Sequence, residues 1–421
     1  MSTVRPAPDP YAMPLEAIDM SDPDLFQHNQ MMPFFKRLRT EAPVHFSPGS
    51  DYGPFWSVTR YDDIMAVDTN HQVFSSDHAR GGHILGYEMF FIEDEDFQLP
   101  MFIAMDQPRH DVTRKTVSPA VGAENLRHME SAIRASCVDI LEQLPVGETF
   151  NWVDRFSIEL TTRTLATLFD FPFEDRRMLT RWSDISVSVP GSGIVDSWES
   201  RRRELEEMGD YFARLWQDRT HNTEGYDLVS MLATGAETRG MSRAEFMGNV
   251  LLLIVGGNDT TRNTLSGSVL ALNDFPDEYE KLRRNPGLIT SFVPEAIRWQ
   301  TPLAHMRRTA LEDAELGGQQ IRAGDKVVMW YLSGNRDERA IERPDQFIVD
   351  RRRPRNHLSF GFGIHRCVGN RLAELQLRIA WEEILKRFRT VEVVGEPVRV
   401  RSNIIMGFSE LPVRLEPWAA A

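Results

Sequence analysis

A short segment near the C-terminus, FGFGIHRCVG, restricts what this chain can fold into more than any other part of the sequence. It surrounds Cys367 with Gly361, Gly363 and Gly369, and a helical pattern follows from Val368 through Leu385. A helix N-terminus favours the thiolate form of a cysteine, because the helix dipole and the free amides stabilise negative charge. The glycines allow the backbone to approach a flat cofactor and leave amides free to hydrogen-bond the sulfur.

A thiolate held in this way can be the axial ligand of a haem iron, where it pushes electron density toward the metal and favours O–O cleavage. The competing interpretation, a free cysteine that is only a small buried apolar side chain, suits Cys137 in the helical pattern SAIRASCVDIL. Two cysteines cannot build a disulfide framework, and they are compatible with a reducing compartment.

Composition and charge exclude several classes of protein. The 421 residues, 41% of them hydrophobic and 26% charged, predict a soluble globular protein with a large core. A net charge of −14 argues against a nucleic-acid binder. The opening segment is proline-rich and acidic, and the longest apolar run, Val250 to Val255, is too short to span a bilayer. We therefore expect a cytoplasmic protein without a membrane anchor.

The patterns along the chain predict an irregular N-terminal arm over residues 1–30 and a single large domain over residues 31–421. VHF and FWSVT form a predicted hairpin around SPGSDYG, and residues 76–104 read as a long functional loop. Helical patterns cover residues 122–144, 151–169, 174–188, 198–218, 242–273, 276–285, 288–299 and 368–388, and β-like pieces cover 307–332 and 390–416. The fold class is mostly α with a small β portion, α+β.

The segment NVLLLIVGGNDTTRNTLSGSVLALN is apolar nearly all round before its glycines, which predicts a helix buried through the middle of the protein. Gly256 and Gly257 inside a helix cost about 1 kcal/mol each relative to alanine. Either close helix packing or a function must offset that cost. Gly256 and Thr260 are four residues apart and share a face, so a surface without a side chain lies one turn from a hydroxyl.

The sequence SFGFGIHRCVGNRLAE is similar to the haem-binding signature of the cytochrome P450 haem-thiolate monooxygenases, and GGNDTT stands where that family has a glycine, an acid and a threonine. The resemblance implies the P450 fold, with the central helix over haem b (iron protoporphyrin IX). It implies that Cys367 is the iron ligand, that Thr260 hydrogen-bonds iron-bound dioxygen or its water, and that Asp259 gates proton delivery. By itself Asp259 could be a solvated surface charge. The cofactor-binding residues also include Gly256, Phe360 and Gly369.

The same resemblance implies supporting residues for the haem. Glu295 and Arg298 in VPEAIRWQ match the family's Glu-x-x-Arg pair, with Arg351 in RPDQFIVDR as the expected third member behind the haem. Four further residues are expected to bind the haem propionates and could alternatively be plain surface charges: His110, Arg114, Arg308 and His365.

Residues 343–371 carry a local excess of positive charge, with arginines at 343, 351, 352, 353, 355, 366 and 371 against two aspartates. Such a run is usually a solvated face. Because it flanks the cysteine loop, it could instead dock an acidic electron donor. The family favours a 2Fe-2S ferredoxin supplied by an FAD-dependent ferredoxin reductase.

The substrate is expected to be small and apolar. Longer matches, including LLIVGGNDTTRNT and KVVMWYLSGNRD, resemble the bacterial branch that hydroxylates medium-chain alkanes and fatty acids at the terminal carbon. Residues 76–104 and 186–200 are the expected lids. A terpenoid or steroid hydroxylase and a haem-thiolate sensor without turnover remain alternatives, although Asp259 and Thr260 argue against a sensor. Expected substrate contacts, each of which could instead be plain core, are Leu252, Val255, Leu303, Ile405 and Phe408.

Overall fold

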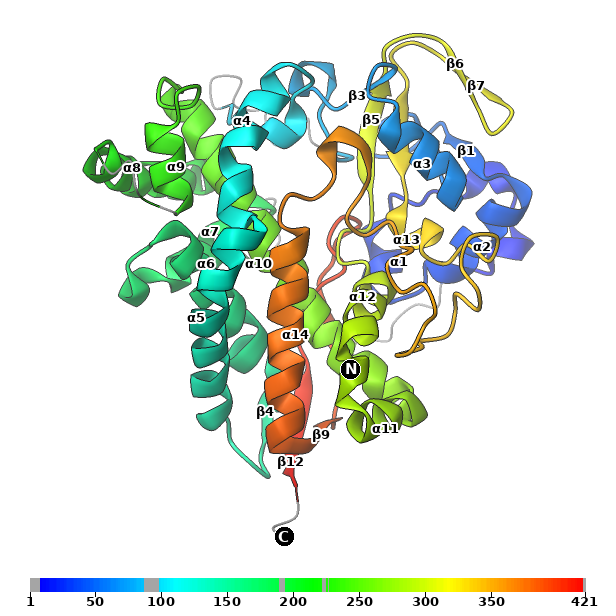
Figure 1. The fold of residues 1–421 in the computed structure, drawn as a ribbon. Helices are drawn as coiled ribbons and strands as arrows, with labels where there is room; N and C mark the ends of the chain where they lie inside the picture. The colour runs from blue at the N-terminus through cyan, green and yellow to red at the C-terminus, as the bar shows by residue number, and fades with distance from the viewer. Residues whose placement is uncertain (1–7, 87–97, 189–193, 222–224, 226, 419–421) are drawn as a thin grey trace. The chain divides into compact units, whose positions relative to one another are not determined.

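The computed structural model describes residues 8–86, 98–188, 194–221, 225 and 227–418 (Figure 1). Contacts group the chain into two compact units, each assembled from segments that are far apart in the sequence. The sheet unit comprises residues 1–87, 267–367 and 396–411, and the helical unit comprises residues 88–266, 368–395 and 412–421.

The sheet unit is built on a five-stranded sheet with the strand order β1-β2-β8-β5-β3. β1 and β2 pair antiparallel, which confirms the predicted hairpin, whereas β2 and β8 pair in parallel. Central strand β8 reads KVVM and is apolar after its first residue, as expected for a strand covered on both faces. The strands of this sheet are β1 (Val44–Ser47), β2 (Phe55–Val58), β3 (Phe74–Ser75), β5 (Met306–Ala310) and β8 (Lys326–Met329).

Two smaller antiparallel pairs and several helices complete the sheet unit. The pairs are β6 (Ala314–Leu316) with β7 (Gln319–Ile321) and β10 (Val398–Arg399) with β11 (Phe408–Glu410). The helices are α1 (Pro23–Gln27), α2 (Met32–Glu41), α3 (Tyr61–Thr69), α11 (Pro276–Arg284), α12 (Ile289–Gln300) and α13 (Tyr331–Gly334). The end of α10, described below, also belongs to this unit.

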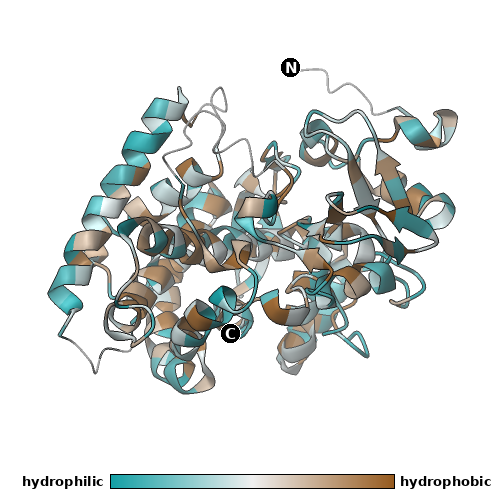
Figure 2. Ribbon diagram, turned by 90° about the horizontal axis from the view of Figure 1, so that it is seen from above, coloured by the Kyte–Doolittle hydropathy of each residue, from teal (hydrophilic) through white to brown (hydrophobic). Residues whose placement is uncertain are grey.

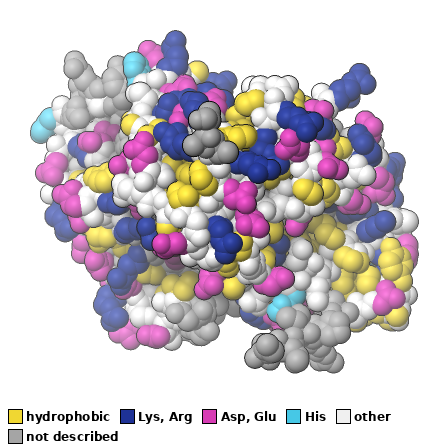
Figure 3. All heavy atoms as spheres, turned by 90° about the horizontal axis from the view of Figure 1, so that it is seen from below, with side chains coloured by type: hydrophobic (Ala, Val, Ile, Leu, Met, Phe, Trp, Pro, Cys, Tyr) yellow, Lys and Arg dark blue, Asp and Glu magenta, His cyan; other side chains and the backbone are white. Residues whose placement is uncertain are grey.

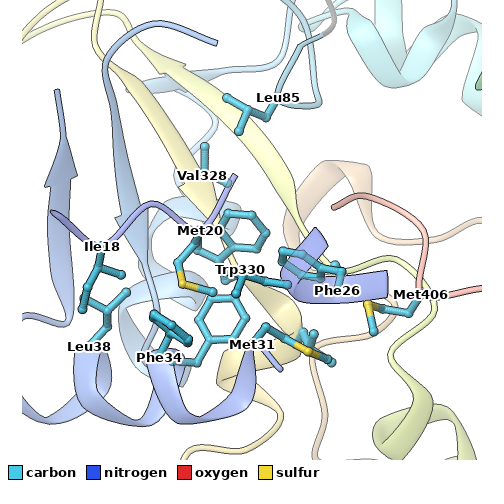
Figure 4. Close-up of a cluster of buried hydrophobic side chains, with 14 of the residues drawn as sticks. Ile18, Met20, Phe26, Met31, Phe34, Leu38, Leu85, Val328, Trp330 and Met406 are labelled. Carbon is cyan, nitrogen blue, oxygen red and sulfur yellow. The ribbon is translucent and has the colours of Figure 1, made fainter. Parts of the chain in front are cut away.

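An aromatic cluster forms the core between α1, α2 and the sheet (Figure 4). The ring of Trp330 lies 5.7 Å from that of Phe26 and 5.3 Å from that of Phe35, and its indole N–H donates a 3.0 Å hydrogen bond to Ser57 Oγ. Ile18 of the N-terminal arm is buried in the same cluster. The arm expected to be irregular therefore contributes to the core, because its apolar side chains fill space beside Trp330.

Helices dominate the helical unit, and most lie where the sequence patterns predict them, but α4 and α9 were not predicted. α6 ends where Asp170 adopts a left-handed conformation, and α8 begins with reciprocal hydrogen bonds between Ser197 and Ser200. A three-stranded antiparallel sheet of β4 (Thr149–Asn151), β12 (Pro412–Pro417) and β9 (Phe388–Val393) completes the unit. The helices are α4 (Arg109–Val117), α5 (Ala123–Glu142), α6 (Glu159–Phe169), α7 (Arg177–Ser186), α8 (Trp198–Arg219), α9 (Leu228–Thr234), most of α10 (Arg243–Asp274) and α14 (Asn370–Arg387).

Helices α5 and α14 lie side by side in Figure 1 and are joined by ion pairs. Arg134 of α5 lies 2.6 Å from Glu382 and 2.7 Å from Glu383 of α14. Cys137 is buried on α5, and burial raises the pKa of its thiol to about 12. The prediction that Cys137 is an inert core residue is confirmed.

The helices carry hydrophobic and hydrophilic residues in alternating patches along their length, as amphipathic helices do (Figure 2). On the face drawn in Figure 3, acidic and basic side chains are interspersed. The net charge of −14 is therefore not gathered into one acidic patch on that face.

The predicted triad of Glu295, Arg298 and Arg351 is present as a buried ion cluster. Glu295 on α12 accepts 2.8 Å hydrogen bonds from Arg298 and a 2.7 Å bond from Arg351 Nε. Arg298 also donates to the backbone carbonyls of Asn335 and Pro344, so the cluster ties α12 to the segment before the cysteine loop. Burial alone would raise the pKa of Glu295, but the hydrogen bonds and charges of the two arginines outweigh burial and lower it.

Replacing Glu295 should strongly destabilise the protein. Glu295→Gln leaves two buried guanidinium groups without their carboxylate, and we expect the free energy of unfolding to fall by about 3 kcal/mol in denaturant titrations at neutral pH. Because the pKa of Glu295 is lowered in the folded state, its contribution is lost as the pH falls through that pKa, so the difference from wild type should shrink in acid.

Glu280→Gln is the matched control, because Glu280 pairs with Arg283 and Arg284 at the surface of α11. This variant should unfold almost as the wild type does. An equal loss of stability in both variants would contradict the role assigned to the buried cluster.

Candidate functional site

The cysteine loop turns on two glycines with left-handed backbone conformations. Gly361 has φ +61° and Gly363 has φ +64°, which side chains with a Cβ rarely adopt. Beyond them, the amide of Cys367 donates a 2.8 Å hydrogen bond to the carbonyl of Phe360, and the cysteine side chain is exposed. Helix α14 begins at Asn370, three residues later in the chain. The loop thus presents its thiol at the surface of the sheet unit.

The glycines of this loop also let it approach the end of α3. A Cβ on Gly363 would overlap the backbone carbonyl of Asp68, and one on Gly361 would lie 3.2 Å from Asp68 Oδ2. The expectation that these glycines make room for a cofactor therefore needs correction, because contact with α3 already requires them. Gly369 differs, since a Cβ there would meet no atom within 4 Å, and it keeps the role predicted for it.

Helix α10 lacks a side chain at one point of its apolar surface, at Gly256, next to the hydroxyl of Thr260. Thr260 Oγ1 donates a 2.8 Å hydrogen bond to the carbonyl of Gly256, and a Cβ on Gly256 would meet nothing within 4 Å. A Cβ on Gly257 would collide with Leu165 of α6. The helix-packing explanation therefore holds for Gly257, whereas Gly256 leaves space beside a hydroxyl and its functional explanation stays a prediction.

Asp259 is buried, and it forms an ion pair with an arginine that also pairs with a second aspartate. Arg262, one turn later on α10, lies 2.8 Å from Asp259 and also 2.8 Å from Asp184 of α7. Burial raises the pKa of Asp259 to about 6, although the positive charge of Arg262 opposes the rise. A carboxyl with such a pKa exchanges its proton near neutral pH, which suits a proton-transfer group. The interpretation of Asp259 as a solvated surface charge is wrong.

The four residues expected to bind propionates have partners of their own. In the sheet unit, Arg308 lies 2.9 Å from the Asp68 carboxylate, and His365 Nε2 lies 2.7 Å from Ser76 Oγ. In the helical unit, His110 Nδ1 lies 2.7 Å from the Asp111 carboxylate, and burial lowers the pKa of His110. Arg114 is half-buried on α4. Arg308 is deeply buried, so the interpretation of this residue as a plain surface charge is wrong.

The expected substrate residues divide into core and partly exposed positions. Leu252 and Val255 are half-buried on α10, and in the sheet unit Leu303 and Ile405 are half-buried and form an isolated antiparallel bridge. Phe408 is 2% exposed, and the guanidinium of Arg399 lies 4.7 Å from its ring centre. The structure therefore favours the core alternative for Phe408.

The two expected lids are described only in part. In residues 76–104, the backbone N–H of Leu85 donates a 3.1 Å hydrogen bond to His305 Nε2. The N–H of Phe102 donates a 3.0 Å bond to Asn249 of α10. In residues 186–200, Arg201 of α8 donates to the carbonyl of Ser186. Residues 87–97 and 189–193, which belong to these two predictions, lie outside the described residues.

The arginine-rich run is mostly a surface feature. Arg351 is buried against Glu295 and does not belong to a docking surface. The run's exposed members are Arg343, Arg352, Arg353, Arg355, Arg366 and Arg371.

Several residues of the two units were not predicted. Asp184 and Asp68 are paired with arginines that are 78 and 240 residues away in the sequence, and no local pattern indicates such pairs. Arg262 could have been found, because its spacing of three residues from Asp259 places both on one helix face. Ser76, beside His365, carries no signal that distinguishes it from other loop serines.

These residues fit a haem-thiolate cofactor. Cys367 offers one exposed sulfur, and a single thiolate holds iron when a porphyrin supplies the in-plane ligands. Gly256 and Gly369 leave open space where a side chain would stand. Arg308 uses one N–H for Asp68 and one for the Arg307 carbonyl, so its guanidinium retains donors for an anionic group.

Comparisons with known proteins show the family of this chain. Residues 287–412 match the family model of cytochrome P450. The chain is 37% identical over 409 residues to linalool 8-monooxygenase of Pseudomonas putida, covering 96% of this chain and 100% of that protein. It is 31% identical over 396 residues to the methyl-branched lipid omega-hydroxylase of Mycobacterium bovis, covering 90% of each. The solved structure of cytochrome P450-153 from Novosphingobium aromaticivorans shares 48% identity with a TM-score of 0.88, covering 94% of this chain and 99% of that one.

The chain is a haem-thiolate monooxygenase and belongs to the cytochrome P450 family. Its cofactor is haem b, and it is similar to the bacterial omega-hydroxylase-like branch of the family. As a P450 it acts on a small substrate and receives electrons from redox partners. No helix in the described part of the chain combines the length and apolar character needed to cross a bilayer.

The carboxyl of Asp259 should titrate with a midpoint near pH 6, well above the usual 3.8, because burial disfavours its charge. The infrared difference between wild type and Asp259→Asn isolates the carboxylic acid band, which should disappear as the pH rises through 6. Arg262→Gln should move this midpoint upward, because it removes the charge that stabilises the carboxylate. A midpoint close to 3.8 in both the wild type and Arg262→Gln would contradict the raised pKa of Asp259.

Proposed function

We propose that this P450 hydroxylates the terminal methyl group of medium-chain alkanes and fatty acids. The reaction is R–CH3 + O2 + 2 e− + 2 H+ → R–CH2OH + H2O. Two observations carry the proposal: an exposed cysteine in a glycine loop of the sheet unit, and a threonine hydroxyl beside an open glycine on α10 of the helical unit. The relative named as an omega-hydroxylase supports the terminal carbon as the target.

Cys367 holds the haem in this proposal. When bound, haem supplies the iron at which dioxygen is reduced by two electrons, and the thiolate favours cleavage of the O–O bond. The backbone N–H of Cys367 is already bonded to the Phe360 carbonyl, which closes the loop that leads to the sulfur. Arg308 and His365 from the sheet unit, and His110 and Arg114 from the helical unit, are proposed partners for the two propionates.

Asp259 and Thr260 deliver the two protons. The pKa of Asp259, raised to about 6, allows it to take up and release a proton near neutral pH. Arg262 connects it to Asp184, a half-exposed carboxylate on α7. Thr260 follows directly on the same helix, with its hydroxyl held by the Gly256 carbonyl. That hydroxyl can also accept a hydrogen bond and so pass a proton on.

Terminal selectivity requires a narrow apolar channel. The C–H bonds of a methyl group are stronger than those of the neighbouring methylene groups. The oxidant therefore attacks the methyl group only where geometry excludes the other carbons. Leu252, Val255, Leu303 and Ile405 are half-buried and apolar, which suits contact with a hydrocarbon chain.

We further propose that a 2Fe-2S ferredoxin, supplied by an FAD-dependent ferredoxin reductase, delivers the electrons in the cytoplasm. The exposed arginines at 352, 353, 355 and 366 surround the cysteine loop in sequence and would attract an acidic partner. Two cysteines in the whole chain suit a reducing compartment.

Hydroxylation of a terpenoid is the second candidate, and the 37% identity to linalool 8-monooxygenase favours it. Steroids, which are also largely apolar and derive from isoprene units, belong to the same alternative. Larger shifts of the haem spin state with limonene or linalool than with octane or dodecanoate would select this candidate over the first.

Cys367→Ser should abolish the red-shifted absorption band of the reduced carbon monoxide complex, because that band requires a thiolate bound to the iron. Cys137→Ala is the matched control and should keep the band, since Cys137 is buried on α5. Absence of the band in the wild type, or of haem from the purified protein, would overturn the proposed function. Retention of the band in Cys367→Ser would place the ligand elsewhere.

With ferredoxin, reductase and NADH, the enzyme should convert a mixture of hexane to dodecane and fatty acids mainly to terminal alcohols, identified by mass spectrometry. Leu303→Ala should lower the ratio of terminal to subterminal product by about tenfold, because a wider channel admits neighbouring carbons. Leu316→Ala, in the β6-β7 hairpin, removes the same atoms and should leave the ratio unchanged. An unchanged ratio in Leu303→Ala would remove Leu303 from the channel.

A further inference from the structure

Asp68, near the C-terminal end of α3, is a buried carboxylate on which three donors converge. Its Oδ1 accepts a 2.9 Å hydrogen bond from Arg308, and its Oδ2 accepts bonds of 2.7 Å from the Phe362 N–H and 2.9 Å from the Tyr331 hydroxyl. Asp68 is 3% exposed. All four residues belong to the sheet unit.

A buried carboxylate at position 68 would destabilise the fold if these partners were absent. A carboxylate in the last turn of a helix faces the negative end of the helix dipole, and burial removes its hydration. Neither cost arises for an apolar side chain of similar size. The three donors, one of them a full positive charge, offset both costs.

Two of the three partners of Asp68 belong to the proposed haem site. Phe362 lies inside the loop, between Gly361 and Gly363, and the absence of a Cβ on those glycines lets the loop reach Asp68. Arg308 lies on β5, where a second N–H is held by the carbonyl of Arg307. One carboxylate therefore sets both the course of the loop that carries Cys367 and the direction of the Arg308 guanidinium.

We propose that Asp68 is a positioning residue of the haem site: it holds the cysteine loop through the Phe362 amide while it aims Arg308 at a haem propionate. This rests on the proposed roles of Cys367 and Arg308. Asp68 itself touches neither cofactor nor substrate in this account. Through these contacts it links the loop that carries Cys367 to Arg308, which is proposed to bind a propionate.

An asparagine cannot replace this carboxylate. The amide offers one acceptor oxygen, and its NH2 group would face either the Phe362 N–H or the Arg308 guanidinium, donor against donor. Asp68→Asn should therefore release the haem about 10- to 100-fold faster into excess apomyoglobin, the range seen when partners behind metal ligands are lost. A larger share of its reduced carbon monoxide complex should lack the red-shifted band.

Asp337→Asn is the matched control. Asp337 is a buried aspartate of the same unit, 3% exposed, and it accepts hydrogen bonds from the backbone N–H groups of Tyr61 and Arg339. It should destabilise the protein toward denaturant without changing haem release or the spectrum. Equal haem release in Asp68→Asn and Asp337→Asn would reduce Asp68 to an ordinary core residue and overturn the proposal.

Two further variants test the proposed role of Asp68 if Asp68→Asn does not fold. Tyr331→Phe removes one donor from Asp68 and nothing else of the cluster, so it should speed haem release, but less than Asp68→Asn. In Arg308→Gln, adding Tyr331→Phe should have less effect than in wild type, because the two donors act through one carboxylate. Unchanged release in Tyr331→Phe would overturn the proposal. If the wild type and Asp337→Asn themselves lack the red-shifted band, the proposed function fails instead.

Discussion

The close approach of the cysteine loop to α3 is the constraint on which the rest of the haem site depends. The loop can follow this course only because Gly361 and Gly363 have no Cβ and accept left-handed conformations. That course brings the Phe362 amide to Asp68 and leaves the Cys367 thiol exposed at the loop's end. Backbone geometry, before any side-chain chemistry, therefore decides where the iron ligand can stand.

Three buried carboxylates in this protein, Glu295, Asp68 and Asp259, each have an arginine within ion-pair distance. Glu295 with its two arginines holds the segment that precedes the loop, and Asp68 with Arg308 holds the loop itself. Burial raises the pKa of both Asp68 and Asp259 despite their arginines, whereas the two arginines of Glu295 lower its pKa. Asp259 differs in its role: Glu295 and Asp68 hold structural elements in place, whereas the pKa of Asp259, about 6, permits proton exchange near neutral pH.

Much of the site could be predicted because its signals are local. The glycine spacing around Cys367, the Gly256 and Thr260 pair on one helix face, and the Glu-x-x-Arg pair are all readable within a few residues. The same glycines were predicted to face a cofactor, and the structure shows that two of them face α3. The N-terminal arm was predicted to lie outside the domain, but its Phe26 is buried and stacked on Trp330. A short segment carries no periodicity that reveals such burial.

The sequence by itself determined the kind of chemistry, since a cysteine among glycines before a helix and a threonine one turn from a glycine are patterns of adjacent residues. Only the tertiary structure decided which charges pair. Arg308 meets Asp68 across 240 residues, and Asp184 meets Arg262 across 78, because strands and helices distant in the chain pack together. The burial of each pair then affects the pKa values of its members. Burial depends on the whole fold, which no short stretch of sequence specifies.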